Sequence, residues 1–362
     1  MTTAASRMPL TTFSSPGTLT ADAPPELRGL RRDGVRLLVA SGQGVEHTTF
    51  SRIGDHLRSG DLLVVNNSAT VAGEVDAVLR GRGPIVVHVS TELDDGTWVV
   101  ELRTAPDGAR AVLDAVAGDV VELHGDRRRR PELLLESPYP EEGSSPTRAG
   151  NRLWRARGAS GGGLPDHLAR HGRPIAYGYL RGRYPLAAYQ TVFGTIPGSA
   201  EMASAARPFT AELVTRLVSA GVVIAPITLH TGLSSQESGE APQPERFAVP
   251  AATATLVNAV RARGGRVVAV GTTATRAIES VASPDGVVHA ADGWTDLVIT
   301  PDRPARVVRG LVTGWHDPDA SHLLLVESVA GPGLTQHAYD VASHEGYAWH
   351  EFGDSCLFLP TV

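Results

Sequence analysis

Along most of the chain, short apolar runs alternate with longer segments in which apolar residues recur at helical spacing. The apolar runs predict buried strands, because a strand covered on both faces is apolar throughout. These strands are expected at 61–66, 222–229, 266–270 and 355–359. The helical pattern covers 210–221, 251–263, 273–282, 320–330 and 334–345. Strands that alternate with helices predict an α/β body with a mostly parallel sheet.

The region between residues 72 and 135 has a different pattern. Short alternating segments at 85–89, 97–103 and 119–123 are separated by Gly/Asp turns. They predict an antiparallel sheet or small barrel, and the Pro/Gly/Ser/Arg-rich stretch that follows marks a boundary. We therefore expect three parts. They are an extended or disordered tail over 1–22, an α/β body formed by 23–71 and 150–362, and an inserted all-β subdomain over 72–149.

Composition narrows the function classes. The chain has 362 residues, of which 42% are hydrophobic and 20% charged, as in a soluble globular protein. No run reaches the roughly 20 apolar residues that span a bilayer, and the single cysteine, Cys356, excludes an intramolecular disulfide. We therefore expect a cytoplasmic location. Every one of the 33 basic residues is arginine, which excludes lysine-based catalysis.

Polar residues directly follow three of the predicted strands. They form the clusters Asn66-Asn67-Ser68, His230-Thr231-Gly232 and Gly271-Thr272-Thr273. Ligands of open α/β sheets bind at the carboxyl ends of strands, so the three clusters predict one site. We expect Thr272 or Thr273 to cap a helix whose N-terminus favours an anion. No Cys/His pattern of a metal site is present, so no metal is expected.

Net charge is −6, but residues 148–183 carry eight arginines and a single acid, Asp166. Trp154 and several tyrosines lie in or beside this segment. Arginines interleaved with aromatic residues suit nucleic-acid backbones and stacked bases. A second basic run, Arg127–Arg130, is interpreted as a solvated loop.

Several motifs, in order and spacing over about residues 24–360, resemble the S-adenosylmethionine:tRNA ribosyltransferase-isomerase family of queuosine biosynthesis. They are Asp61–Ser68, Tyr189–Phe193 with Pro197–Ser199, Thr228–Gly232, Gly264–Ser280, Thr313–Pro318 and Tyr347–Asp354. The resemblance implies a composite α/β body with an inserted closed antiparallel β-barrel. It also implies an enzyme that transfers a rearranged ribosyl group, an epoxycyclopentanediol, from S-adenosylmethionine to a 7-deazaguanine base of tRNA.

The resemblance and the strand ends together give three sets of candidate site residues. Those expected in catalysis are His230 as acid or base, with Arg276 and Glu279 as positioning groups. Those expected to bind S-adenosylmethionine are Asn66, Asn67, Ser68, Gly198, Ser199, Gly271, Thr272 and Thr273. Those expected to bind the acceptor are Tyr189, Gln190, Arg181, Arg183, His316 and Asp354.

The chain departs from the family pattern at several motif positions. An arginine is replaced by Ala69, a histidine by Pro208 and an asparagine by Gly314, while Glu201 is introduced and Ser234 stands where the family has glycine. Proline cannot donate a hydrogen bond or move a proton. Two alternatives to the tRNA reaction therefore stay open. One is a paralogue that uses S-adenosylmethionine on a small-molecule acceptor, and the other is a non-catalytic binding protein.

Overall fold

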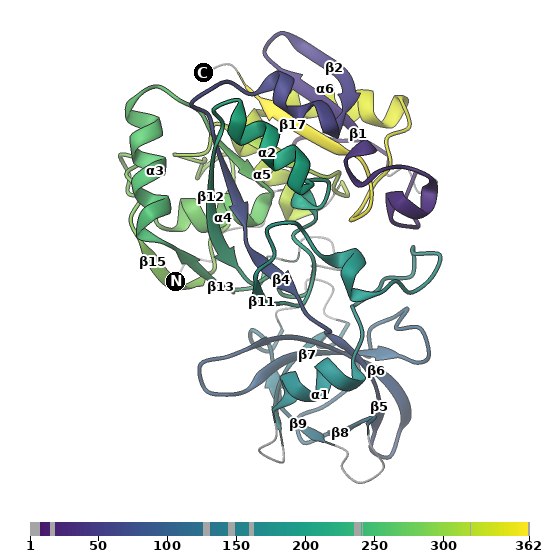
Figure 1. The fold of residues 1–362 in the computed structure, drawn as a ribbon. Helices are drawn as coiled ribbons and strands as arrows, with labels where there is room; N and C mark the ends of the chain where they lie inside the picture. Colours follow the sequence, from purple (N-terminus) through teal and green to yellow (C-terminus); the bar gives the residue numbers. More distant parts are fainter. Residues whose placement is uncertain are drawn as a thin grey trace.

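The computed structural model describes residues 8–14, 19–125, 131–143, 149–158, 163–234, 240, 242–318 and 320–360. The basic run Arg127–Arg130 and Arg148 lie outside the described residues, as does part of the predicted tail. The α/β body and the barrel are stacked one above the other, with the barrel at the bottom of Figure 1.

Nine of the strands in the described part of the chain form one sheet in the body. Their order is β15 (Ala291–Thr295), β13 (Glu245–Val249), β12 (Val223–Leu229), β3 (Leu62–Asn66), β14 (Val267–Val270), β16 (Gly310–Thr313), β17 (Ser355–Leu359), β1 (Arg36–Ser41) and β2 (Gly44–Thr49). The four central strands from β12 to β16 are parallel, and so are β17 and β1. The other pairs are antiparallel. The sheet is therefore mixed, with the predicted parallel arrangement at its centre.

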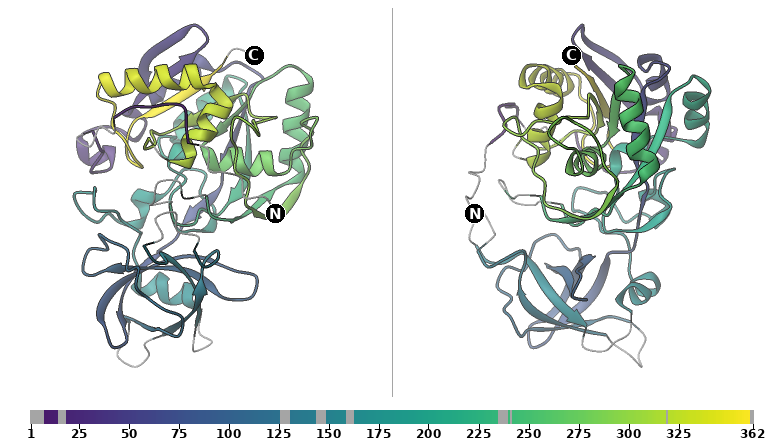
Figure 2. Two further views of the ribbon diagram at one scale, coloured as in Figure 1. Left: turned by 180° about the vertical axis from the view of Figure 1, so that it is seen from behind. Right: turned by 90° about the vertical axis from the view of Figure 1, so that its left-hand side faces the viewer.

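Helices cover both faces of this sheet (Figure 2). They are α2 (Ala211–Ser219), α3 (Ala251–Ala262), α4 (Thr272–Ser280), α5 (Ser321–Ala330) and α6 (Pro332–His344), with the short 3-10 helices η1 (Pro25–Arg28), η2 (Arg32–Gly34), η3 (Phe50–His56), η4 (Leu186–Tyr189) and η5 (Ser204–Ala206). Strand β3 shows why two layers form. Leu62 and Val64 enter the core under α3–α6, and Leu63 and Val65 enter the core under α2 and η3, because successive side chains of a strand point to opposite faces.

A closed antiparallel barrel forms the second part, as predicted. Its strands follow in the order β10 (Leu153–Gly158), β7 (Trp98–Thr104), β6 (Gly83–Glu92), β5 (Glu74–Leu79), β8 (Val120–Leu123) and β9 (Glu132–Pro138), and β9 closes on β10. The closing strand lies beyond the boundary expected at residue 149. Helix α1 (Leu164–His171) packs against the barrel. A parallel two-stranded ribbon, β4 (Ser68–Thr70) with β11 (Ile196–Ser199), connects the barrel to the body (Figure 1).

Buried charges cluster where the barrel faces the body. His88 lies between Glu74, with Nε2 3.2 Å from one carboxylate oxygen, and Glu101, with Nδ1 3.5 Å away. Burial alone would lower the pKa of His88, but the two carboxylates outweigh it and raise that pKa. Arg103 contacts Glu101 at 2.7 Å and also lines the large cavity described below. The ion network therefore reaches from the barrel interior to that cavity.

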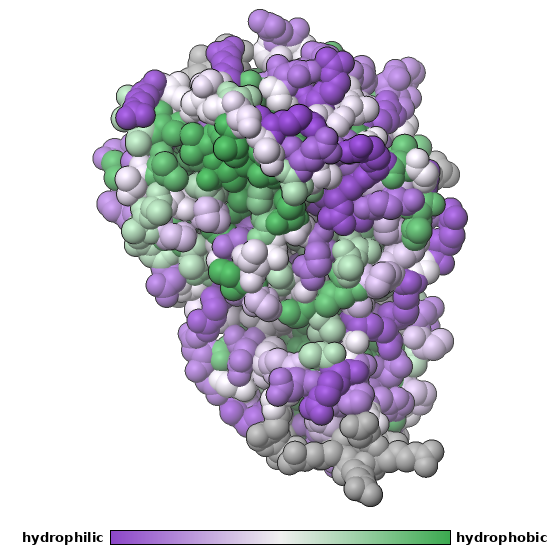
Figure 3. Space-filling model, in the orientation of Figure 1, coloured by the Kyte–Doolittle hydropathy of each residue, from purple (hydrophilic) through white to green (hydrophobic). Residues whose placement is uncertain are grey.

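The face seen in Figure 3 is mostly polar, with apolar side chains gathered around α2 and α3. Val218 and Leu256, on these helices, are among the exposed large hydrophobic residues. No helix in the described ranges is long and apolar enough to cross a membrane.

Candidate functional site

The three predicted polar clusters meet at the carboxyl edge of the parallel strands. Ser68 Oγ lies 2.7 Å from His230 Nδ1 and 2.6 Å from Ser199 Oγ. Ser199 Oγ in turn accepts a hydrogen bond from the Thr231 N–H at 3.0 Å. Two of the three clusters therefore form one continuous polar structure with the predicted Ser199. The third, Gly271-Thr272-Thr273, lines the same cavity as Thr231.

A cavity of about 660 Å³ opens beside this structure, between the body and the barrel. Its described walls come from the loop after β11, the loop after β12, the start of α4, the loop after β16 and the segment before β17. Of the predicted site residues, five line it: Gly271, Thr272, Thr273, Arg276 and His316. A cavity of this size accommodates a nucleoside joined to an amino acid.

The N-terminus of α4 opens into this cavity. Gly271 precedes the helix with φ of 94°, a conformation that suits glycine, and no threonine side chain caps the helix. The predicted cap is therefore wrong, because the turn at Gly271 leaves the first N–H groups of the helix uncapped. Thr273 Oγ1 is buried and has no hydrogen-bond partner among the described residues. This end of the helix therefore favours an anionic ligand group.

Arg276 holds one wall of the cavity together. Its guanidinium pairs with the Glu245 carboxylate and donates to the carbonyls of Leu297, Thr295 and Gln243 at 3.1–3.3 Å. Burial raises the pKa of Glu245, and Arg276 opposes this rise. These contacts tie α4 to β15 and to the segment before β13.

Two stacked histidines form another part of the wall. The rings of His316 and His322 lie 4.9 Å apart and nearly parallel, and His316 Nε2 is 2.8 Å from Thr313 Oγ1. Burial lowers the pKa of His322 to about 4 and that of His316 well below its usual value. Burial therefore favours the neutral form of both imidazoles at pH 7 and makes each a weaker base than a solvated histidine.

Other predicted residues do not line the cavity. Asn66 is fully buried, and its amide joins β3 to Leu229 at the end of β12. Asn67 accepts a hydrogen bond from the Thr228 hydroxyl. His230 lies behind the wall against Gly198, where an added Cβ would come within 2.6 Å of the imidazole. Burial, and to a smaller extent Arg246, lower the pKa of His230. These side chains shape the strand ends that support the cavity.

Four more predicted residues also bond within the protein. Glu279 accepts hydrogen bonds from the three backbone N–H groups of 306–308. Asp354 accepts from the Arg36 and Ala348 N–H groups. The Gln190 amide pairs with both backbone groups of Thr70, and the neighbouring Tyr189 is buried. Their contacts fix loops at the edges of the site.

The predicted basic segment is largely neutralised by acids from other parts of the chain. Six of its seven described arginines form ion pairs. The pairs are Arg152–Glu240, Arg155–Asp95, Arg157–Glu136, Arg173–Glu74, Arg181–Asp22 and Arg183–Glu74. Since these acids lie far away in sequence, the local count of charges could not show this pairing.

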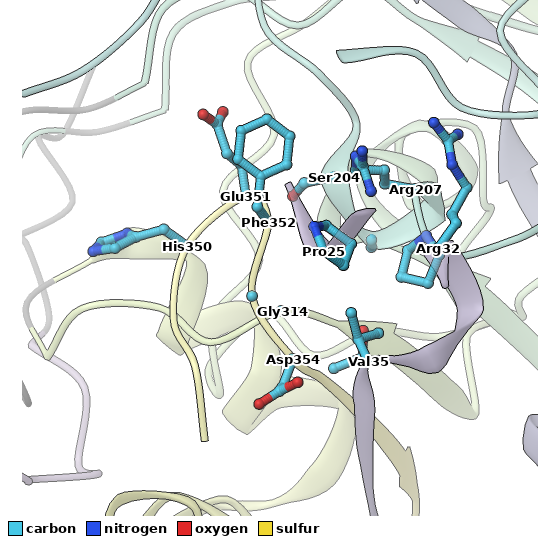
Figure 4. A pocket seen from close by; sticks show the side chains of 14 residues that line it. Pro25, Arg32, Val35, Ser204, Arg207, Gly314, His350, Glu351, Phe352 and Asp354 are labelled. Carbon is cyan, nitrogen blue, oxygen red and sulfur yellow. The ribbon is translucent and has the colours of Figure 1, made fainter. Parts of the chain in front are cut away.

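Many cavity residues were missed by the site prediction, and the ionisable side chains Glu201, His322, His350 and Glu351 are among them. Figure 4 shows the His350 ring and the Glu351 carboxylate on the segment before β17, in a small pocket that adjoins the cavity. The same pocket contains Pro208, one of the departures from the family pattern. The departures from the family pattern at Glu201, Ser234 and Gly314 were the signals in the sequence that could have indicated this wall.

Glu351 gives the site a pH-dependent stability. Burial, and next the charge of Glu201, raise the pKa of Glu351 to about 8 from 4.5. Between these values the folded state holds a proton that the unfolded state has lost, so stability falls as pH rises. Relative to the Glu351→Gln variant, the free energy of unfolding of wild type should fall by up to about 1.4 kcal/mol per pH unit between pH 5 and 8. Urea unfolding of both proteins measures this, and a difference that is constant with pH would contradict it.

Comparisons with known proteins agree along nearly the whole chain. A family model described as queuosine biosynthesis protein matches residues 10–358. An S-adenosylmethionine:tRNA ribosyltransferase-isomerase from Moorella thermoacetica is 34% identical over 346 residues, which cover 91% of this chain and 94% of the relative. A protein of the same name from Thermus thermophilus is 33% identical over 340 residues, with 91% and 93% covered.

A solved structure is also similar. The crystal structure of an S-adenosylmethionine tRNA ribosyltransferase from Thermotoga maritima superposes with a TM-score of 0.51 at 27% identity, covering 96% of this chain and 99% of that one. The predicted family and composite fold are thus confirmed, and so is the predicted enzyme class, a transferase and isomerase that uses S-adenosylmethionine. The chain belongs to the queuosine biosynthesis protein family.

Proposed function

We propose that this protein is an S-adenosylmethionine:tRNA ribosyltransferase-isomerase that acts on a 7-deazaguanine base of tRNA in the cytoplasm. The single observation that carries the proposal is the uncapped N-terminus of α4, which opens into a cavity of about 660 Å³ at the carboxyl ends of parallel strands. Membership of the family supports it, since relatives that bear this name match more than nine-tenths of the chain.

The cavity fits S-adenosylmethionine in its chemistry as well as its size. A carboxylate suits the N–H groups at the start of α4 and the unpartnered Thr273 hydroxyl. Buried polar atoms of Gln243 and Ser321, which also line the cavity, have no partner among the described residues, and they offer hydrogen bonds to sugar or base. When bound, S-adenosylmethionine supplies the ribosyl group that the reaction transfers.

The proton transfers that the reaction needs can be assigned to groups on the cavity wall. His316 and His322 line the cavity as neutral imidazoles, the form that a general base must have before it takes a proton. The Arg276–Glu245 ion pair joins α4 to β13 beside the cavity. Glu279 supports the loop before β16 by three hydrogen bonds. The walls come from both the body and the barrel, which limits access of bulk water.

His230 is proposed to position the wall through Ser68, Ser199 and Thr231. Because its ring does not line the cavity, His230→Ala should lower kcat by about tenfold or less and leave the pH profile of kcat/KM unchanged. His322→Ala should remove one limb of that profile. Because the pKa of His322 is about 4, steady-state rates of wild type and both variants from pH 3 to pH 9 measure this. A pH profile that changes only in His230→Ala would return His230 to the role of acid or base.

The proposed reaction is tested by incubating the protein with S-adenosylmethionine and measuring released adenine and methionine. Release that requires tRNA carrying a 7-aminomethyl-7-deazaguanine base supports the proposal. Wild-type protein that binds S-adenosylmethionine but releases neither product with this tRNA would contradict it.

A second function, transfer to a small-molecule acceptor, is favoured by the ion pairs of residues 152–183. Binding to tRNA through free arginines would weaken steeply as salt rises. Paired arginines contribute few such contacts, so a weak dependence of tRNA affinity on salt would support this second function. Product release that does not depend on tRNA would establish it.

A further inference from the structure

We propose that Glu351 and Glu201 form a subsite for a positively charged group of the substrate, an aliphatic ammonium or a sulfonium. The inference rests on the proposed function, since it assigns a binding group within the same cavity. Glu201 follows β11 and Glu351 precedes β17, so two distant parts of the chain bring their carboxylates to one wall.

The carboxylate of Glu351 forms no ion pair with any cation in the described part of the chain. Its Oε1 atom is shielded from solvent and has no hydrogen-bond partner among the described residues. Arg207 is the positive group whose field reaches Glu351, but its guanidinium bonds to Glu26 and to the Ala188 carbonyl at 2.9 Å. A buried carboxyl in this situation ionises most readily when a cation binds beside it.

Glu201 is fixed in direction by neighbouring donors. The Ser234 N–H donates to its carboxylate at 2.9 Å, and the hydroxyls of Ser234 and Tyr177 donate as well. These contacts hold the carboxylate in one orientation at the cavity wall. Glu201 and Ser234 are both departures from the family pattern, so two changes in this chain meet in one contact at the cavity wall.

Aromatic faces complete the same wall. The Tyr179 ring stacks on the His350 ring with centroids 4.5 Å apart and on the Tyr177 ring at 6.2 Å. All three residues line the cavity. The faces of aromatic rings attract cations, most strongly where water is excluded. Two carboxylates beside stacked rings are therefore suited to an ammonium or sulfonium group.

This subsite and the anion site at the start of α4 border the same cavity. Ala205, in the same loop as Glu201, lies 3.3 Å from the place where a Cβ on Gly271 would stand. The carboxylate wall and the uncapped helix end therefore face one space. An amino-acid group, which carries both a carboxylate and an ammonium, can satisfy both.

The test measures the affinity of four probes by calorimetric titration of the full chain. S-adenosylmethionine carries an ammonium and a sulfonium, S-adenosylhomocysteine an ammonium alone, and 5′-methylthioadenosine neither. The fourth probe, 7-aminomethyl-7-deazaguanine, carries the ammonium of the acceptor. Glu351→Gln and Glu201→Gln should each weaken binding of at least one cationic probe by about tenfold or more, because a charge-assisted contact is lost. Binding of 5′-methylthioadenosine should be unchanged.

The pattern of losses identifies the bound group. Losses with both S-adenosyl probes indicate the donor ammonium, a loss with S-adenosylmethionine alone indicates the sulfonium, and a loss with the deazaguanine alone indicates the acceptor. Glu212→Gln, an exposed carboxylate on α2, is the matched control and should change nothing. Ser234→Ala keeps the charge of Glu201 but removes its hydroxyl donor, and it should weaken cation binding less than Glu201→Gln does.

Two results would overturn the subsite. One is unchanged affinity in both glutamine variants while wild type binds S-adenosylmethionine, which leaves the proposed function intact. The other is an equal loss for every probe, 5′-methylthioadenosine included. Wild-type protein that binds no S-adenosyl probe would overturn the proposed function together with the subsite. Urea unfolding of each variant checks that it is folded. If Glu351→Gln does not fold, the affinities of Glu201→Gln decide the test.

Discussion

Replacing Arg276 by methionine should destabilise the protein by about 3–5 kcal/mol, because the buried Glu245 carboxylate would lose its ion-pair partner. Side-chain exposure of this pair is only 8% and 13%. The three carbonyls that the guanidinium bonds would also lose a donor. Since Glu245 and Gln243 line the cavity, binding of S-adenosylmethionine should fall with stability. Urea unfolding and calorimetric titration measure the two effects.

Two further variants distinguish the effect of breaking the buried ion pair from the effect of removing any positive charge. Arg276→Met combined with Glu245→Gln should recover part of the lost stability, because the uncompensated charge is removed. Arg216→Met breaks the exposed pair with Glu212 on α2 and should cost less than about 0.5 kcal/mol. An Arg276→Met protein as stable as Arg216→Met would show that the buried pair contributes nothing.

Gly271→Ala should reduce affinity for S-adenosylmethionine by more than about tenfold. The new Cβ would stand 3.3 Å from Ala205 Cβ and 3.5 Å from Thr273 Oγ1, over the helix end proposed to bind the carboxylate. Because φ at this position is 94°, the substitution should also cost about 1–2 kcal/mol of stability. Titration and urea unfolding distinguish the two losses.

Gly264→Ala is the matched control, since it lies at the other end of β14 with φ of 73° and nothing within 4 Å of the added Cβ. It should lose a similar amount of stability and bind S-adenosylmethionine as wild type does. Equal affinities for both alanine variants would mean that the start of α4 does not contact the ligand.

Local pattern in the sequence was sufficient for most of the fold. The apolar run at 267–270 with Gly271 after it predicted both β14 and the turn into α4. A strand buried on two faces is apolar throughout, and a positive φ favours glycine. The antiparallel edges of the sheet were not predicted. Strand β13, for example, is half-buried and follows a long loop, so its pairing with β12 depends on the tertiary fold.

The site was predicted only in part, for a physical reason. Strand ends can be located by pattern, and Gly271 and Thr273 line the cavity as expected. The direction in which the side chains after a strand end point depends on tertiary packing. Asn66, for example, turns inward to join two strands. Glu351 lines the cavity from a segment whose pattern predicts no regular structure. Its raised pKa arises from burial and from Glu201, which is distant in sequence.

The ribbon of β4 and β11 has a mechanical consequence. β4 continues from the end of β3 into the barrel, while β11 carries Ser199, which bonds both Ser68 and the Thr231 N–H at the cavity wall. A tilt of the barrel against the body would therefore displace Ser199 and Thr231 together. The ribbon therefore couples the orientation of the barrel to the position of Thr231 in the cavity wall.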